Sequence, residues 1–117
     1  MLLSTSAKTL WNFLAAGQIR NLKNNNVIDV YNLATKTVGQ YGLNSPSSTN
    51  QEWQVNYVAK NTYILTTQLN MGISLAFRNG TATLTNYSTS DTTQLWVIQP
   101  CTASLNGKFL SLRGGIF

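Results

Sequence analysis

Few residues of this chain could take part in catalysis. Its 117 residues include no His, only three acids (Asp29, Glu52 and Asp91) and a single cysteine, Cys101. A Ser-His-Asp or Cys-His arrangement is therefore impossible, and there is no cluster of His and Cys that could hold a metal ion. Two of the acids could still meet as a carboxylate pair. Even so, the inventory favours a binding protein over an enzyme, and we expect neither cofactor nor metal.

The composition favours hydrogen bonding to a polar ligand. Charged residues make up only 9% of the chain, against about a quarter in an average soluble domain, and Asn, Thr, Ser and Gln take their place. The formal net charge is +5, but Lys and Arg are scattered with no run of three. Nucleic-acid-binding proteins gather their cations on one face or stripe. We therefore expect no nucleic-acid partner.

The sequence gives weak signals about location. One cysteine excludes an internal disulfide and mildly favours a reducing compartment. Residues 1–16 are apolar but interrupted by Lys8 and Asn12, without the basic start and unbroken apolar run of a signal peptide. No apolar run is long enough to cross a bilayer. We expect a protein that is cytoplasmic or secreted without a clear signal peptide, and no membrane insertion.

A repeat organises the chain. The three Trp residues are Trp11, Trp53 and Trp96, spaced 42 and 43 residues apart. Two of them end a Gln-x-Trp sequence, at residues 51–53 and 94–96, and the stretch before Trp11 is a weaker echo. A fixed period of this length is typical of a repeat architecture.

Short alternating segments fill each repeat, and none keeps a helical period over ten residues. We predict strands at residues 9–14, 18–22, 27–31, 35–41, 51–58, 62–67, 72–77, 81–86, 94–99 and 108–113. Residues 42–49 contain Asn44-Ser45-Pro46-Ser47-Ser48 and are predicted as a loop. We call residues 17–58 the first lobe and residues 59–99 the second lobe. The pattern predicts an all-β fold.

These features together resemble a known family. Asn50 precedes the Gln-x-Trp sequence, and Ile28-Asp29-Val30 lies about twenty residues earlier, within a period in the low forties. This resembles the ricin B-type lectins, and the Asn-, Ser- and Thr-rich composition is similar to that of the fungal members. The resemblance implies a β-trefoil, in which three four-strand repeats surround a pseudo-three-fold axis. We therefore expect residues 1–117 to form one domain, with the three Trp side chains in its core.

The third lobe departs from the family pattern. The chain begins with the end of a repeat and stops within another. We predict that the third lobe is split, so that residues 9–14 pair with the strand at 107–113. In our alignment residues 108–113 match 26–31 and 72–77, which are second strands. A truncated third lobe is the alternative.

The resemblance also implies a sugar site in the first lobe. In ricin-type lectins, each lobe can hold one galactose-like sugar through an Asp, an aromatic ring and an Asn. A carboxylate accepts two hydroxyl hydrogens, an aromatic face covers the C–H groups of the sugar, and an amide both donates and accepts. The residues carried over are Asp29 as carboxylate, Tyr41 as ring, Asn50 as amide, Gln51 as a brace for Asp29 or the turn, and Gln40 or Asn44 as a further hydrogen-bonding group.

Simpler roles remain open for two of these residues. Asp29 could keep an edge strand soluble, and Gln51 could merely satisfy backbone groups of a turn. The other lobes lack the full set. In our alignment the Asp and Asn positions are Ser74 and Thr93 in the second lobe, where Tyr87 could still stack, and Ser111 and Thr9 in the third. We predict one working site.

The expected function is that of a lectin for galactose or N-acetylgalactosamine groups, without catalysis and with glycans or glycoconjugates as partners. One shallow site gives a Kd near 1 mM, or about −4 kcal/mol. Useful avidity then requires a homo-oligomer or a multivalent surface. One alternative is a protein-binding trefoil, such as a protease inhibitor or toxin-complex subunit, acting through residues 42–50. Another is a carbohydrate-binding module whose toxin or hydrolase partner is a separate chain.

Overall fold

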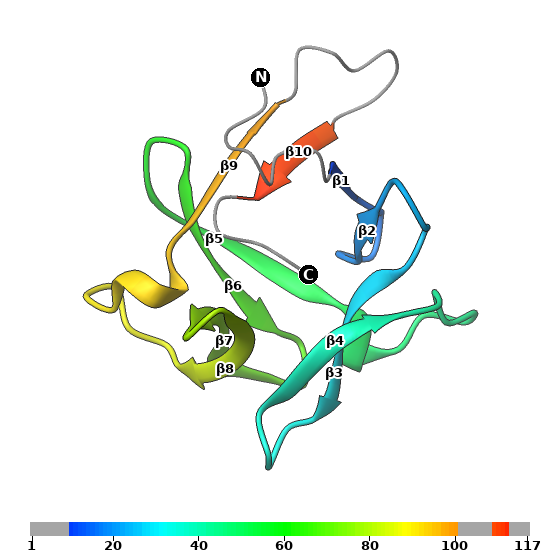
Figure 1. The fold of residues 1–117 in the computed structure, drawn as a ribbon, viewed down its shortest axis with the longest axis horizontal. Helices are drawn as coiled ribbons and strands as arrows, with labels where there is room; N and C mark the ends of the chain where they lie inside the picture. Colours follow the sequence, from blue (N-terminus) through cyan, green and yellow to red (C-terminus); the bar gives the residue numbers. More distant parts are fainter. Residues whose placement is uncertain (1–9, 101–108, 113–117) are drawn as a thin grey trace.

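The computed structural model describes residues 10–100 and 109–112, which form short β-strands (Figure 1). The first lobe contains β2 (Ile19–Asn21), β3 (Val27–Asn32), β4 (Thr37–Tyr41), the 3-10 turn η2 (Thr49–Gln51) and β5 (Trp53–Ala59). The second contains β6 (Thr62–Thr67), β7 (Asn70–Arg78), β8 (Thr81–Asn86), η3 (Thr92–Gln94) and β9 (Trp96–Pro100). Two further strands are β1 (Trp11–Phe13) and β10 (Phe109–Leu112). The prediction of an all-β fold is confirmed.

Tight turns join neighbouring strands. Four non-glycine residues have positive φ, and each lies between two paired strands: Asn25 (φ 64°), Lys36 (φ 61°), Asn61 (φ 59°) and Asn79 (φ 52°). Three of the four are Asn, whose short polar side chain tolerates the left-handed conformation. The predicted turn at residues 23–26 is confirmed, since Asn25 is its left-handed residue.

Six strands pair in a ring in the order β5, β6, β9, β10, β1 and β2, and every pairing between them is antiparallel. The ring closes where the N–H of Trp53 donates to the carbonyl oxygen of Gly17 at 3.1 Å, just before β2. Gly17 has a φ of +92°, and a Cβ there would lie 2.5 Å from the carbonyl oxygen of Trp53. Only glycine fits this close approach of two backbones.

The two ends of the described chain meet within this ring. β1 pairs with β10, with Trp11 opposite Leu110 and Asn12 opposite Phe109, and Figure 1 shows β10 between β9 and β1. The predicted pairing of residues 9–14 with residues 107–113 is confirmed for these strands. The third lobe is therefore split between the N-terminal and C-terminal parts of the chain.

The predicted alignment of residues 108–113 with the second strands is wrong. β10 pairs with β9 on one side and β1 on the other, just as β6 pairs with β5 and β9. β10 is thus a first strand, and Ser111 does not correspond to Asp29. First and second strands share an alternating pattern, so residue types alone did not separate them. Thr9, the other predicted third-lobe position, lies outside the described residues.

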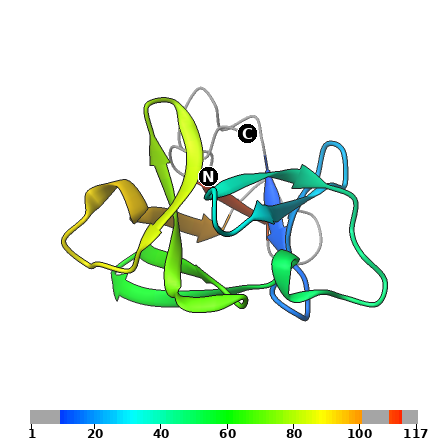
Figure 2. The same ribbon diagram turned by 90° about the horizontal axis from the view of Figure 1, so that it is seen from below.

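Two hairpins, β3–β4 and β7–β8, stand on the ring. Figures 1 and 2 show them next to each other. Thr37 of β4 pairs with Thr83 of β8, and the Thr83 hydroxyl donates to the Lys36 carbonyl oxygen at 3.1 Å. These contacts fix the first lobe against the second.

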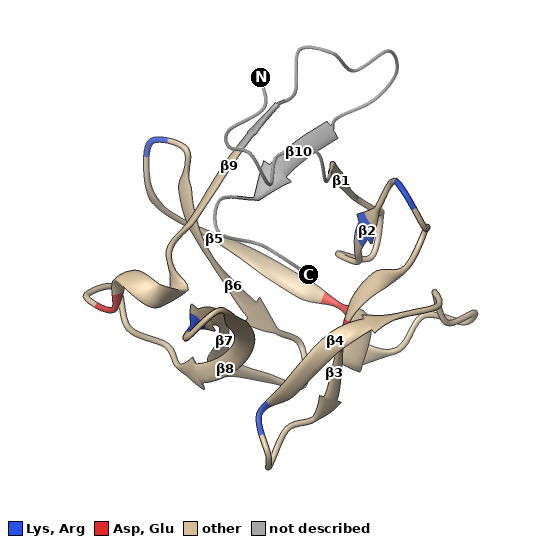
Figure 3. Ribbon diagram, in the orientation of Figure 1, with Lys and Arg blue, Asp and Glu red and all other residues tan. Residues whose placement is uncertain are grey.

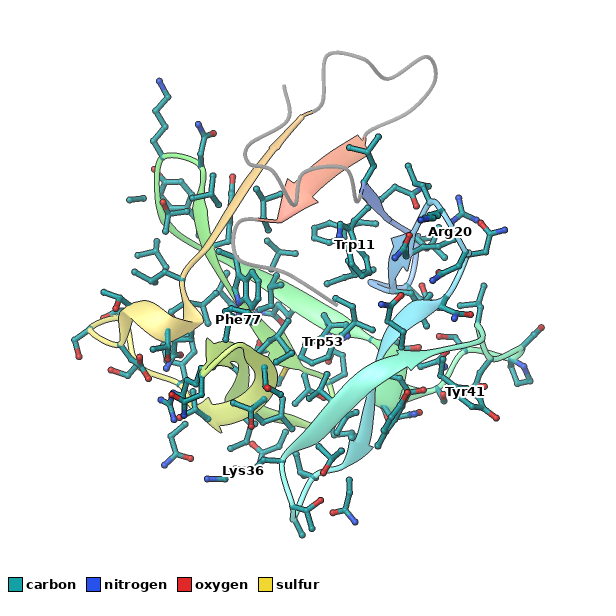
Figure 4. The ribbon with its side chains drawn as sticks, viewed as in Figure 1. Trp11, Arg20, Lys36, Tyr41, Trp53 and Phe77 are labelled. Carbon is teal, nitrogen blue, oxygen red and sulfur yellow. The ribbon has the colours of Figure 1, made fainter. Side chains whose placement is uncertain are left out.

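The predicted Trp core is confirmed. Trp11, Trp53 and Trp96 are 0%, 2% and 1% exposed. The other buried members of the core cluster are Ile19, Ile28, Val30, Leu65, Leu75, Ala82, Leu84 and Ile98. In Figure 4, Trp11 and Trp53 point toward the middle of the molecule. Large buried aromatic surfaces contribute strongly to stability. The Trp residues that recur along the sequence are therefore the ones that build the core.

The surface carries few charges, and they are dispersed. Figure 3 shows Lys and Arg at separate points of the ribbon. Within the described part of the chain, no helix is long and apolar enough to span a membrane.

Candidate functional site

The first lobe contains a pocket of about 290 Å³. Its lining residues come from β3, the end of β4, the following loop and η2: they are Asp29, Val30, Tyr31, Tyr41, Asn44 and Asn50. Small-ligand pockets usually measure about 300–1,000 Å³, so this one suits a small ligand. Four of the six residues carried over from the resemblance line it.

Asp29 is buried, with 4% of its surface exposed. Its Oδ1 accepts a hydrogen bond from Asn50 Nδ2 at 3.0 Å, and its Oδ2 accepts one from Gln51 Nε2 at 2.8 Å. These bonds offset the loss of hydration. A carboxylate offers about four acceptor positions, so each oxygen keeps capacity for another donor.

Two amides orient the Asp29 carboxylate, and no cation of residues 10–100 pairs with it. Among the described residues the only ion pair is Arg78–Asp91, in the second lobe. The carboxylate therefore presents its charge to the pocket, where donors such as hydroxyl groups bind more strongly than to a neutral acceptor.

Gln51 is fully buried and braces both Asp29 and the adjoining loop. Besides its bond to Asp29, its Nε2 donates to the Gly42 carbonyl oxygen at 2.8 Å, and its Oε1 accepts from the Asn44 N–H at 2.8 Å. Gln51 thus provides hydrogen-bond partners for backbone groups of the loop and also positions the Asp29 carboxylate. The sequence had left these two roles as alternatives. Gln51 is not among the residues that line the pocket.

Asn44 and Asn50 each keep a free acceptor oxygen at the pocket, and Tyr41 offers an exposed ring. Asn44 Nδ2 donates to Ser48 Oγ at 2.7 Å, but the Oδ1 atoms of Asn44 and Asn50 have no hydrogen-bond partner among the described residues. Tyr41 is 61% exposed, and Figure 4 shows it outward of the buried Trp53. An exposed ring beside a carboxylate can cover an apolar face of a ligand.

The Gln40 side chain points to the turn between β2 and β3 and does not line the pocket. Its Oε1 accepts hydrogen bonds from Asn21 Nδ2 at 3.2 Å and Asn24 Nδ2 at 3.5 Å. The Gln40 side chain therefore stabilises the first-lobe turn and is not among the pocket-lining groups.

Sequence reasoning missed Tyr31. This residue lies on β3 two positions after Asp29, at a bulge in the pairing with β4, and its ring lies over Gly39, the cross-strand partner of Asp29. Tyr31 lines the pocket and is 52% exposed. The signal was an aromatic residue two positions from the carboxylate, next to a strand that contains Gly39.

In the second lobe the bond of the closing Trp places Ala76 at the position of Asp29. The predicted Ser74 instead contacts the buried Gln94, its hydroxyl donating to Gln94 Oε1 at 2.5 Å, as Asp29 contacts Gln51. In each lobe the indole N–H of the closing Trp donates to a carbonyl oxygen of the second strand, and the acceptors are Ile28 (3.1 Å) and Leu75 (3.0 Å). Asp29 and Ala76 are the residues that follow these acceptors. The alignment given by the indole bonds therefore differs by two residues from the predicted one; β7 is longer than β3, and both strands alternate.

The position of Tyr41 is occupied by Thr85 in the second lobe. The buried Gln of each Gln-x-Trp sequence donates to one loop carbonyl oxygen, that of Gly42 or that of Asn86. Tyr41 and Thr85 immediately precede these residues. Tyr87 lies one residue beyond Asn86, so it does not occupy the position of Tyr41, and its role as a stacking ring stays a prediction.

Arg78 spans the second-lobe equivalent of the pocket. It lies two residues after Ala76, and its guanidinium donates to Thr93 Oγ1 and Thr85 Oγ1 at 3.0 Å each and to Asp91 Oδ2 at 2.5 Å. The hydroxyl and backbone N–H of Thr93 lower the pKa of Asp91 well below its usual range, with smaller contributions from Gln94 and Arg78. In the second lobe, positions equivalent to those that line the first-lobe pocket are therefore occupied by residues bonded to one another in a polar network.

Comparison with known proteins establishes the fold. No family model matches the chain, and no curated protein matches it. Among solved structures it is similar to the crystal structure of a designed 3-fold symmetric protein, ThreeFoil, with a TM-score of 0.54 and 20% sequence identity. The match covers 80% of this chain, which spans 66% of the length of that one. The likeness and the strand pairings together show that the chain adopts the β-trefoil fold.

Proposed function

We propose that this protein is a lectin that binds a galactose or N-acetylgalactosamine group in the first-lobe pocket and carries out no catalysis. The observation behind this proposal is the Asp29 carboxylate, held by two amides and free of any cation among the described residues. Each carboxylate oxygen can accept one more hydrogen bond. Two hydroxyl groups on adjacent ring carbons supply donors at a matching spacing.

The rest of the pocket suits the same ligand. Tyr41 offers an exposed aromatic face for the C–H side of a sugar ring. The free Oδ1 atoms of Asn44 and Asn50 can accept from further hydroxyl groups. The choice of galactose-type sugars comes from the resemblance of Asp29, Tyr41 and Asn50 to the ricin B-type pattern.

A single pocket of this size implies weak binding. Its open, polar lining suits a Kd near 1 mM, about −4 kcal/mol. Binding to a cell surface or glycoprotein then requires several copies of the site on one particle, through a homo-oligomer or a multivalent array of this chain.

Calorimetric titration with methyl β-galactoside and N-acetylgalactosamine, supported by a glycan array, tests the proposal. Asp29→Asn should weaken binding about tenfold or more, since hydrogen bonds to a charged group contribute about 1.5–3 kcal/mol. Asp91→Asn is the matched control, because it makes the same chemical change in the second lobe. Equal binding by the wild type and Asp29→Asn would show that the pocket is not the site.

The loop at residues 42–48 supports a second candidate, binding of a protein partner. Gln18 Nε2 donates to Ser47 Oγ at 2.6 Å, and Ser47 Oγ donates to the Glu52 carboxylate. These bonds hold an exposed loop in one shape, which lowers the entropic cost of docking into a cleft. Inhibition assays against serine and cysteine proteases test this candidate, and a protein that binds sugars alone should inhibit none.

A further inference from the structure

Tyr31 is held in one position on the outer face of the first-lobe hairpin. Its hydroxyl donates to the Gln40 carbonyl oxygen at 2.5 Å. Its ring lies directly over Gly39, where an added Cβ would be 2.6 Å from both the Tyr31 Cζ and hydroxyl oxygen. Any other residue at position 39 would therefore displace the ring.

The backbone itself does not require a glycine at position 39. Gly39 pairs with Asp29 in the middle of the β3–β4 ladder, and the positive-φ glycines of the described residues are Gly17 and Gly80. Glycine in a strand interior weakens the strand and often marks the close approach of another group. Here that group is the Tyr31 ring.

A fixed ring at the surface is suited to binding. Tyr31 is 52% exposed and Tyr41 is 61% exposed, and both line the pocket that contains Asp29. A buried anchor would hide its ring, whereas Tyr31 leaves much of its surface open to solvent. Because the hydroxyl bond and Gly39 already restrict the ring, little side-chain freedom is lost when a ligand contacts it.

We propose that Tyr31 is a second aromatic platform, which contacts the sugar residue next to the one bound at Asp29 and Tyr41. The ligand class is then a galactose-terminated disaccharide or longer glycan. This inference rests on the proposed lectin function and deepens it. Tyr41 serves the terminal sugar, and Tyr31 provides the selectivity for what is attached to it.

The second lobe supports a ligand-related role for Tyr31. Its β7–β8 hairpin has Arg78 two residues after Ala76, and Arg78 bonds to Thr85, Thr93 and Asp91 within the lobe. A hairpin of this fold therefore forms without an aromatic ring at that position. The pair of Tyr31 and Gly39 belongs to the lobe that has the pocket.

Calorimetric titration of the full chain with methyl β-galactoside, lactose and the disaccharide galactose-β-1,3-N-acetylgalactosamine tests the inference. At least one disaccharide should bind the wild type about two- to tenfold more tightly than the monosaccharide, the range expected for one aromatic contact. Tyr31→Ala should remove this preference, because it weakens binding of the disaccharide more than binding of methyl β-galactoside. Tyr41→Ala should weaken binding of all three probes.

Two more variants separate loss of the platform from loss of folding. Gly39→Ala keeps Tyr31 but displaces its ring, so it should also remove the disaccharide preference. Tyr31→Phe keeps the ring without its hydroxyl bond and should retain part of the preference. Thermal unfolding and methyl β-galactoside binding show whether each variant is folded.

The outcomes distinguish this inference from the proposed function. A wild type that binds the probes with equal affinity, or a Tyr31→Ala variant that weakens all of them equally or none, overturns the role of Tyr31 and leaves the lectin function standing. A wild type that binds none of the probes, or an Asp29→Asn variant that binds them all normally, overturns both.

Discussion

The first and second lobes share a framework but differ in what they place on it. Both bury a Gln that holds the loop before the closing strand, and in both the closing Trp bonds to a carbonyl oxygen of the second strand. The first lobe adds Asp29 and two exposed Tyr rings around a pocket. The second has Ala76 and a guanidinium bonded to neighbouring side chains. Groups present in both lobes hold the fold, and groups confined to one are candidates for function.

The largest effect should follow from breaking the shared framework. Trp96→Ala removes a ring that is 1% exposed from the core, and substitutions of this kind cost about 3–5 kcal/mol in the free energy of unfolding. Urea denaturation measures the loss. A cost below about 1 kcal/mol would show that Trp96 is not part of a shared core.

The two buried glutamines sharpen the comparison. Gln51→Ala and Gln94→Ala each leave a loop carbonyl oxygen and a backbone N–H without a partner, at about 1–3 kcal/mol per unsatisfied group. Only Gln51 also contacts Asp29. Both variants should lose stability, but galactoside binding by the folded fraction should fall in Gln51→Ala alone. Equal binding losses would remove the distinction between the lobes.

The division into repeats and their shared core could be predicted from the sequence, because both depend on residues that recur every 42 or 43 positions. Trp11, Trp53 and Trp96 are large and rare, so their spacing located the core directly. The pocket was partly predictable for the opposite reason, since Asp29 is one of only three acids and precedes Asn50 by a family-like interval.

The remaining features depend on register and on contacts between strands, which alternation does not determine. A shift of two residues along a strand leaves the same face buried, so Ser74 and Ala76 matched Asp29 equally well. The contact of Tyr31 with Gly39 joins two strands and has no signature in either one. The Arg78 network likewise brings together three segments of the second lobe.

Transfer of the site tests whether the differing residues are sufficient. The combined change Ala76→Asp, Arg78→Tyr, Thr85→Tyr and Thr93→Asn gives the second lobe four of the six pocket-lining residues of the first. Thr83→Gly is added because Thr83 pairs with Ala76 as Gly39 pairs with Asp29, and the new ring needs the same space. Gln94 is buried like Gln51, and its bond to Asp91 Oδ2 would have to be exchanged for one to the new carboxylate. Titration with methyl β-galactoside should then give two sites per chain at similar affinity. A folded variant with one site would show that the loop at residues 42–48 is also required.

The smallest effect concerns the charge network that takes the place of the pocket. Hydrogen bonds from Thr93 lower the pKa of Asp91 in the folded state, below the value of about 3.9 for an unfolded Asp. The unfolded chain then binds more protons at acid pH, so the stabilisation is complete above about pH 4 and decreases as pH falls toward the lowered pKa. Asp91→Asn should reduce stability at pH 6, and the difference from the wild type should shrink as pH falls from 4 to 2.

Urea denaturation midpoints of the two proteins between pH 2 and pH 6 measure this difference in stability. Asp91 is part of an exposed network, so the difference should be small and should decrease in high salt. A constant difference between pH 2 and pH 6 would mean that the Asp91 charge contributes nothing and that its position is occupied for packing alone.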